Sequence, residues 1–348
     1  MEDKQDPYAV LRLKEYRFFI ISRFMMMVAI QIQAVAVGWQ VYQLTKDPLS
    51  LGLIGLVEAV PSIAVALYAG HLADISNRKN IMLVCITTFL LCAFSLYLFT
   101  FEDIKQMINF NVYHLYAVIF ISGLARGFMG PASFGLMSQI VPKELYANSS
   151  LWSSTVFQLG LVAGPAAGGL IYGFWGVNFT YLIVCFLVLT GLFSIVLIAS
   201  KPIPEITEKQ SLADSLTAGI KFVFKNQVIL GALSLDLFAV LFGGAVALLP
   251  IFADEILHVG PKGLGFLRAA PAIGAVIMSG FMAFNPGLKR AGRNLLVCVG
   301  AFGLCMIFFG ISTNFYLSAI LLALSGMFDN VSVVIRSTIM QTMTPDNM

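Results

Sequence analysis

The sequence predicts an all-α polytopic membrane protein, and two observations carry the prediction. Of its 348 residues, 59% are hydrophobic and only 11% are charged, and the mean hydropathy is +0.88. A soluble domain carries roughly a quarter charged residues. Apolar runs of about 20 residues recur along the whole chain, and each is long enough to cross a bilayer as a helix.

These runs predict ten spans, six before a polar stretch at 200–227 and four after it. We expect residues 1–199 to form one helical half and residues 228–348 to form a second, incomplete half. The polar stretch begins with two prolines and reads as an amphipathic helix at the membrane surface. In order, the spans lie near 19–44, 50–71, 80–101, 114–140, 147–173, 178–199, 228–252, 263–284, 294–312 and 315–341.

The distribution of Lys and Arg predicts the orientation, because positive charge gathers on the cytoplasmic side. With the N-terminus inside, 15 Lys and Arg residues lie in cytoplasmic segments, Arg23 among them, and 4 lie outside. The N-terminus is too charged for a cleaved signal peptide. Residues 70–80 therefore face the cytoplasm, and 200–227 is a cytoplasmic linker.

The two parts of the chain repeat each other. GLVEAVPSIA (55–64) and GFLRAAPAIG (265–274) share Gly, Ala, Pro and Ile in register, and the spacing within 126–142 equals that within 329–345. Matching spans run in the same direction, as in transporters built from two parallel, pseudo-symmetric halves. Chance similarity between apolar helices is the alternative. If the halves match, two of twelve spans are missing, so we expect a C-terminally truncated chain, with a ten-span family as the other possibility.

The loop GHLADISNRK (70–79) clusters charge between apolar runs, and it resembles the signature loop of the major facilitator superfamily. Ile75 and Asn77 depart from that pattern. The resemblance covers essentially the whole chain and implies the superfamily fold. It implies a cytoplasmic gate that latches the two halves, although the charges would also serve as topology anchors alone. The matching residues are Gly70, Leu72, Asp74, Arg78 and Lys79.

Two further motifs match the same superfamily. In span four, Arg126 and Gly130 fit an R-x-x-x-G motif whose arginine is associated with proton coupling in relatives. An arginine at mid-membrane is costly unless it faces a cavity or a partner, and a snorkelling or structural role is the alternative. In span five, GLVAGPAAGG resembles the antiporter motif, which implies export. It would form a bending or packing seam between the halves, through Gly160, Gly164, Pro165, Gly168 and Gly169.

Other charges within the spans are few, which makes each a candidate for coupling or substrate binding. In this superfamily, spans one, four, seven and ten line the central cavity. Each residue would serve equally as part of a structural ion pair. The candidates are Glu58, Arg126, Asp236, Asp329 and Arg336, and Arg268 stands at the position that matches Glu58.

Several activities lack their motifs. The chain has no GxxxxGK[ST] phosphate-binding loop, no HExxH or other metal-ligand spacing, and no nucleophile cluster. We therefore expect no cofactor, no metal, no nucleic-acid partner and no enzymatic activity. The expected partners are the lipid bilayer and a small-molecule substrate, with the protein as a monomer.

Within the superfamily, RFFIISRF (17–24), VGWQVYQLTKDPLSLGLIGL (37–56) and SLADSLTAGIKFVFKN (211–226) resemble the branch of the enterobactin exporter and macrolide efflux pumps. The resemblance implies proton-driven efflux of a small amphipathic compound, drug-like or siderophore-like, by alternating access across a bacterial inner membrane. An importer of a solute or lysolipid is the alternative. A membrane-embedded enzyme or a non-transporting receptor fits the repeat and the mid-membrane charges less well.

Overall fold

The computed structural model describes residues 8–201, 224, 226–242, 244–284 and 291–343. The chain divides into two compact units, Met1–Thr207 and Glu208–Met348. The amphipathic helix expected within 200–227 lies outside the described residues.

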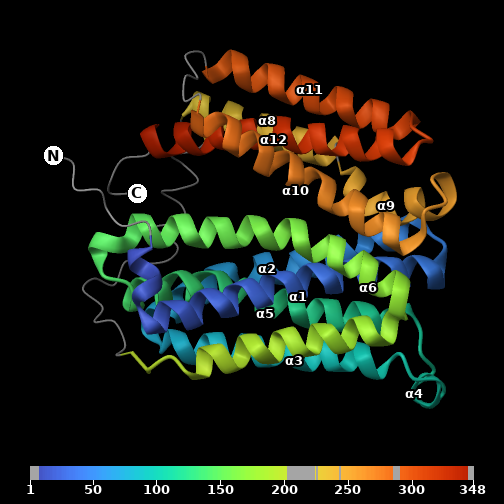
Figure 1. Cartoon of the computed structure of the whole chain (residues 1–348), viewed down its shortest axis with the longest axis horizontal. Helices are drawn as coiled ribbons and strands as arrows, with labels where there is room; N and C mark the ends of the chain where they lie inside the picture. The colour runs from blue at the N-terminus through green and yellow to red at the C-terminus, as the bar shows by residue number, and fades with distance from the viewer. Residues whose placement is uncertain (1–7, 202–223, 225, 243, 285–290, 344–348) are drawn as a thin grey trace. The chain divides into compact units, whose positions relative to one another are not determined.

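The first unit is a bundle of long helices joined by short turns (Figure 1). After a 3-10 turn at Ala9–Arg12, α1 runs from Lys14 to Thr45 and α2 from Pro48 to Ile75. The chain reverses because Lys46 adopts left-handed backbone angles and the Asp47 carboxylate accepts hydrogen bonds from the amides of Leu49 and Ser50. Such an N-cap satisfies donors that a helix start leaves unpaired.

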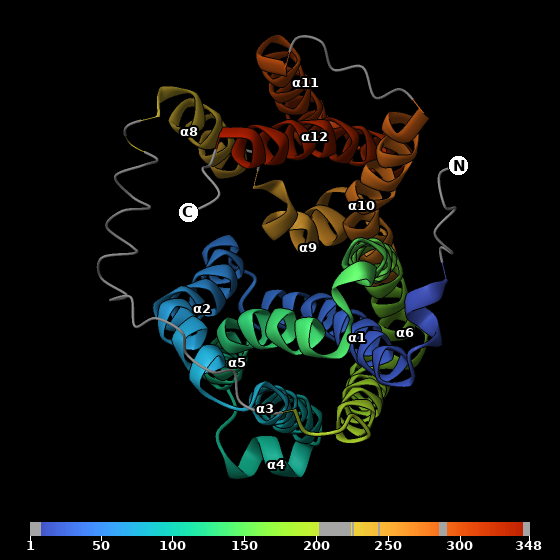
Figure 2. The same ribbon diagram turned by 90° about the vertical axis from the view of Figure 1, so that its left-hand side faces the viewer.

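The remaining helices of this unit follow the predicted order. They are α3 (Arg78–Leu98), the short α4 (Glu102–Met107), α5 (Val112–Ile140) and α6 (Tyr146–Val196), with a 3-10 turn at Lys143–Leu145 before α6. Asn111 and His114 form a capping box at the start of α5. Figure 2 shows α2 beside α5 and α1 beside α6, and the residue contacts agree.

The 51 residues of α6 contain two of the predicted spans. A straight helix of that length would extend about 77 Å, far more than the roughly 30 Å of a hydrocarbon core. Gly176 divides it, with φ of 78° and ψ of −179°, angles that are open essentially to glycine alone. The helix stays continuous through Pro165, and its break lies at Gly176.

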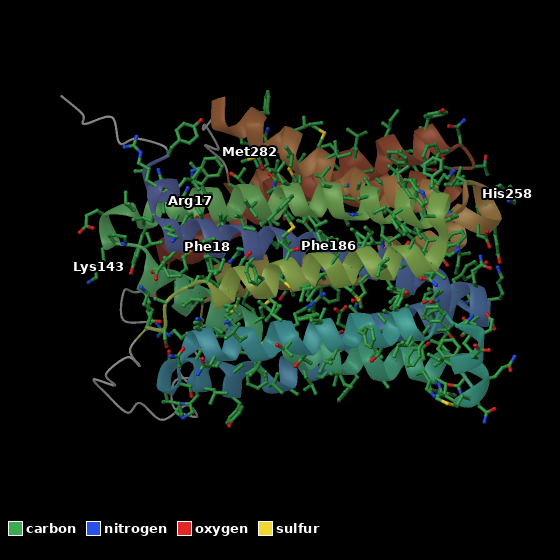
Figure 3. All side chains as sticks on the ribbon, turned by 60° about the horizontal axis from the view of Figure 1, so that its bottom comes forward. Arg17, Phe18, Lys143, Phe186, His258 and Met282 are labelled. Carbon is green, nitrogen blue, oxygen red and sulfur yellow. The ribbon has the colours of Figure 1, made fainter. Side chains whose placement is uncertain are left out.

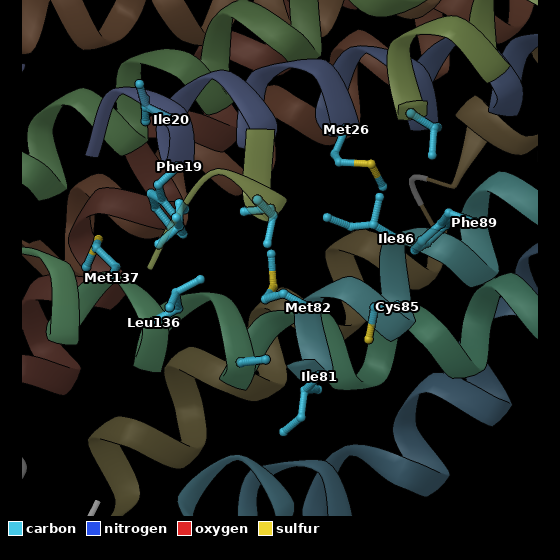
Figure 4. Close-up of a cluster of buried hydrophobic side chains, with 14 of the residues drawn as sticks. Phe19, Ile20, Met26, Ile81, Met82, Cys85, Ile86, Phe89, Leu136 and Met137 are labelled. Atoms are coloured by element: carbon cyan, nitrogen blue, oxygen red, sulfur yellow. The ribbon is translucent and has the colours of Figure 1, made fainter. Parts of the chain in front are cut away.

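An apolar core joins α1, α3 and α5 in the first unit. Figure 4 shows Phe19 and Met26 of α1 close to Met82 and Ile86 of α3, with Leu136 of α5 nearby. The outer faces of the helices are also apolar, and Phe186, in the part of α6 beyond Gly176, is 64% exposed (Figure 3). Apolar side chains on both the inner and the outer faces are expected of helices in a lipid environment.

The second unit contains α8 (Gln227–Phe242), α10 (Gly260–Phe284), α11 (Ala291–Ile311) and α12 (Phe315–Met343). The predicted span 228–252 is not one helix. Beyond α8 the chain forms a 3-10 turn at Ala245–Leu248, the single turn α9 (Leu249–Ile251) and a π-helical turn at Phe252–Ile256. The Gly243-Gly244 pair and Pro250 in the sequence account for this, because both residue types disfavour a continuous helix.

Within the described part of the chain, eight helices are long and apolar enough to cross a membrane. One of them is α6, which holds two spans on either side of Gly176, and α8 is a shorter apolar helix. The spans of the prediction therefore correspond to helical segments of the structure, apart from the break after α8.

Candidate functional site

An ion pair links α2 and α5 in the first unit. Arg126 lies at the middle of α5, and its Nη2 is 2.8 Å from Oε1 of Glu58 on α2. The side chains are 41% and 30% exposed, so both charges are partly withdrawn from solvent. A carboxylate beside the guanidinium lowers the cost of an arginine within the bilayer. Sequence analysis proposed both residues singly, and the structure brings them together.

Glycines of α5 hold this ion pair at short range by letting the two helices approach. A Cβ on Gly123 would lie 2.5 Å from the carbonyl oxygen of Glu58, and one on Gly127 would lie 2.5 Å from Cγ2 of Val65. Both separations are shorter than van der Waals contact, so only glycine fits at this spacing of the helices. Small residues four apart are a general means of close helix packing in membranes.

The signature loop binds neighbouring helices of its own unit. Arg78 donates from Nε to the carbonyl of Ala73 and from Nη1 to the carbonyl of Gly135, both at 3.0 Å. Lys79 donates to the carbonyls of Val196 and Ile198. These cations satisfy backbone carbonyls at the ends of α2, α5 and α6, as basic side chains commonly do at helix C-termini.

The charged residues of this loop differ in their contacts. Arg78 and Lys79 are engaged within the first unit. Asp74 is different, because its side chain is 74% exposed and lies 3.7 Å from Arg78 in the local ion pair that the i, i+4 spacing predicts. Gly70 and Leu72 lie on the last turns of α2, and a Cβ on Gly70 would meet nothing within 4 Å.

Asn77 departs from the superfamily pattern and has a clear local role. Its side chain accepts a hydrogen bond from the amide of Asn80 and so caps α3. Its amide group donates to Ser200 and to the carbonyl of Lys201. Lys201 in turn pairs with Glu15 of α1 at 2.6 Å. The loop therefore fastens the end of α6 and the start of the following segment to the rest of the unit.

The glycine motif of α6 packs against α1. A Cβ on Gly164 would lie 2.5 Å from Cβ of Gln31, and Cβ atoms on Gly160 and Gly168 would contact Met27 and Ile32. These glycines therefore form a packing seam with a helix of their own unit. Pro165 and Gly169 are buried beside them.

The second unit carries a different ion pair. Arg336 of α12 pairs with Asp236 of α8, and their side chains are 12% and 31% exposed. Asp329 of α12 is exposed, and Arg268 of α10 is half-buried. The described contacts therefore join two of the predicted residues, Asp236 and Arg336, and place Asp329 apart from that pair.

Backbone packing in the second unit repeats that of the first. A Cβ on Gly326 would clash with the carbonyl of Pro271, just as one on Gly123 would contact Pro61 and the carbonyl of Glu58. These residues match at constant offsets of 210 residues (Pro61 to Pro271) and 203 residues (Gly123 to Gly326). The same offsets place Arg268 opposite Glu58 and Asp329 opposite Arg126, so the signs of the charges are exchanged.

A cavity of about 340 Å³ lies in the first unit between α1 and α5. Arg126 lines it together with Arg23, whose Nη1 donates to Ser133 Oγ at 3.3 Å. Arg23, which the sequence analysis counts among the cytoplasmic charges, is the tenth residue of the 32-residue helix α1. Sequence analysis did not select it as a site residue, although it interrupts an apolar run that starts at Phe18.

Comparisons with known proteins agree with this architecture. Residues 19–348 match the Major Facilitator Superfamily. The enterobactin exporter EntS of Escherichia coli O1:K1 / APEC is 27% identical over 96% of this chain and 78% of its own length, and EntS of Shigella boydii serotype 18 is 26% identical over the same shares.

Solved structures show the same fold at low sequence identity. The POT family transporter PepTSo is similar with a TM-score of 0.69 and 13% identity over 97% of this chain and 85% of that one. A bacterial homologue of the iron transporter ferroportin, in an inward-facing state, is similar with a TM-score of 0.67 and 14% identity. The match covers 97% of this chain and 86% of that one. With the helical repeat and the family match over nearly the whole sequence, the chain belongs to the Major Facilitator Superfamily and is a transport protein, not an enzyme.

Proposed function

We propose that this transporter is a proton-coupled exporter of a small amphipathic organic compound, drug-like or siderophore-like, acting by alternating access. It would act as a monomer in a bacterial inner membrane, with its N-terminus in the cytoplasm. The observation that carries the proposal is the ion pair between Glu58 and Arg126 at the middle of α5. The family supplies the transport activity, and the exporter relatives favour the outward direction.

The ion pair offers a physical means of coupling. When Glu58 takes up a proton it loses its charge, and Arg126 loses its ionic partner. An uncompensated arginine within a membrane is costly, so the protonated protein favours an arrangement in which Arg126 meets another acceptor. Deprotonation restores the pair. The protein then has two states that differ in this contact. Proton binding favours one state, and substrate binding favours the other.

The Asp236–Arg336 pair of the second unit is a second candidate for the coupling carboxylate. Like the first pair, it joins two helices through charged side chains that are partly buried. No cofactor is needed in this scheme, because the proton gradient supplies the driving force.

Everted membrane vesicles test the proposal, with three probes that share one fluorophore. Dansylate is an anion, dansylamide is neutral and dansyl-ethylenediamine is a cation. An exporter accumulates at least one probe in everted vesicles when the lumen is acidified, and not in right-side-out vesicles. Accumulation only in right-side-out vesicles would identify an importer, and none in either orientation would contradict the proposal.

Variants locate the coupling residue in the same assay. Glu58→Gln keeps the shape of the side chain and removes its charge, and we expect gradient-driven accumulation to fall at least about tenfold. Glu102→Gln is the matched control, because Glu102 forms an exposed 2.7 Å pair with Lys105 on the short helix α4. We expect this control to transport like the wild type.

A further inference from the structure

The cavity of the first unit has an apolar body and a polar end. Methionine and phenylalanine side chains form most of its wall, among them Met26, Met129 and Phe157. Its polar groups are the side chains of Ser22 and Ser133 and the guanidinium groups of Arg23 and Arg126. An apolar pocket with a few convergent polar groups is typical of a small-molecule site, and about 340 Å³ lies at the lower end of the usual range.

The charges in this cavity do not balance. Arg126 shares its charge with Glu58. Arg23 donates a hydrogen bond to the uncharged hydroxyl of Ser133 and forms no ion pair with any residue that the structure describes. It is half-buried on α1, and burial of a charge without a counter-charge is costly. One positive charge of the cavity therefore lacks a counter-charge among the described residues.

A second observation points the same way. Ser22 is 1% exposed and lines the cavity, yet its hydroxyl has no hydrogen-bond partner in the described part of the chain. A buried hydroxyl without a partner is destabilising by about 1–3 kcal/mol, so such a group is a candidate for binding a ligand. Two guanidinium groups and a hydroxyl all present donors, and the chemistry that satisfies them together is an anionic oxygen acceptor.

We propose that this cavity binds the acidic group of the transported compound, so that the substrate is an amphipathic organic acid. Arg23 holds the anion, with Ser22 and Arg126 as further donors, and the methionine-rich wall receives the apolar part. Guanidinium groups bind oxyanions with two parallel hydrogen bonds, which gives direction as well as affinity. Thioether side chains adapt to aromatic groups of different shape.

The arrangement also links binding to the ion pair. An anion at Arg126 competes with Glu58 for one guanidinium group, so substrate binding weakens the Glu58–Arg126 contact. This inference deepens the proposed function by naming its substrate class. It rests on the proposed function only in that the bound compound is the one transported. Equilibrium binding tests it without any gradient, so its failure is distinguishable from a failure of the export proposal.

The experiment measures binding of the three dansyl probes to the full chain in phosphatidylcholine nanodiscs, by fluorescence anisotropy. We expect dansylate to bind at least about tenfold more tightly than dansylamide or dansyl-ethylenediamine, the difference that one charge-assisted hydrogen bond supplies. Arg23→Gln should abolish this preference, and Arg23→Lys should retain part of it.

Arg17→Gln is the matched control. Arg17 lies on the same helix, is exposed and does not line the cavity, and Figure 3 shows it near the end of the helix bundle. Removal of its charge should leave dansylate binding within twofold of the wild type (about 0.4 kcal/mol). Equal binding of all three probes, or undiminished dansylate binding by well-folded Arg23→Gln, would overturn the inference.

The anion could come from a soluble organic acid or from a lipid headgroup, and varying the lipid composition distinguishes these two sources. With phosphatidylglycerol in the nanodisc, unchanged dansylate affinity identifies a site for a soluble organic acid. Reduced affinity in the wild type, but not in Arg23→Gln, identifies an anionic lipid headgroup as the occupant.

Discussion

The two units of this transporter share their backbone packing and differ in their charges. In the first, the glycines of α5 bring it against α2, and Glu58 pairs with Arg126 across that contact. In the second, α12 packs on α10 through Gly326 and Pro271, but the matching residues carry exchanged charges, and the ion pair joins α12 to α8.

The comparison shows which features the repeat retains. Close backbone contacts permit only glycine, so Gly123 and Gly326 occur at matching positions. A charged side chain is not constrained in this way, and Ser133, which accepts from Arg23 in the first unit, matches Arg336 in the second by the same offset of 203 residues. We infer that packing defines the common scaffold and that the charges give each unit its own part in transport.

The largest expected effect comes from giving position 126 of the first unit an acidic residue, as at the matching position Asp329 of the second. Arg126→Glu places two carboxylates together, and at an effective dielectric constant of 20 two charges 4 Å apart interact by roughly 4 kcal/mol. Since both groups are partly exposed and screened, we expect transport to fall on the order of 100-fold. Exchange of both charges, Glu58→Arg with Arg126→Glu, should restore thermal stability but not gradient-driven accumulation. Restored accumulation would show that only charge balance matters there.

Alanine substitutions at the matching glycines test whether the close helix packing that both units share requires glycine. Gly123→Ala and Gly326→Ala each push a methyl group into a facing backbone, and overpacking of this kind is destabilising by about 1–3 kcal/mol. Gly130→Ala is the control on α5, because a Cβ there meets nothing within 4 Å. Unfolding titrations in mixed micelles measure the three variants. If Gly123→Ala were as stable as Gly130→Ala, the close contact would be absent.

A smaller effect distinguishes two residues of the signature loop. Arg78→Gln removes two hydrogen bonds to carbonyls and should reduce stability by about 1–2 kcal/mol. Asp74→Asn should change it by less than about 0.5 kcal/mol, because the Asp74 side chain is 74% exposed and lies 3.7 Å from Arg78. Thermal unfolding of both variants against the wild type checks this. An equal loss for Asp74→Asn would indicate that its carboxylate makes a contact that the described residues do not show.

The smallest expected effect is a pH dependence at the turn between α1 and α2. Hydrogen bonds from Ser50 and Leu49 lower the pKa of Asp47 below its ordinary value of 3.8. The carboxylate therefore stabilises the fold above pH 3.8, and that contribution is lost as the pH falls through the lower, folded-state pKa. The difference in unfolding free energy between Asp47→Asn and wild type, measured between pH 3 and 6, should decrease toward the acid end. A constant difference would exclude this titration.

The helices of each unit were predicted from the sequence, but most contacts between side chains of different helices were not. Apolar runs predicted the helices because each must span a bilayer, and a local Gly-Gly pair explains the break after α8. The partners of Arg78 and Gly164 could not be predicted, since periodicity does not reveal which neighbouring helix a side chain faces. Arg23 was not selected as a site residue because a charge near the start of a span resembles a flanking charge.

The central claim is that the Glu58–Arg126 pair couples protons to transport, and purified Glu58→Gln in proteoliposomes tests it most directly. Two rates are compared with those of the wild type: exchange of dansylate across the membrane without a gradient, and its accumulation driven by a pH gradient. The account predicts exchange within about threefold of the wild type and accumulation abolished. Accumulation equal to that of the wild type, or loss of both activities together, would contradict it.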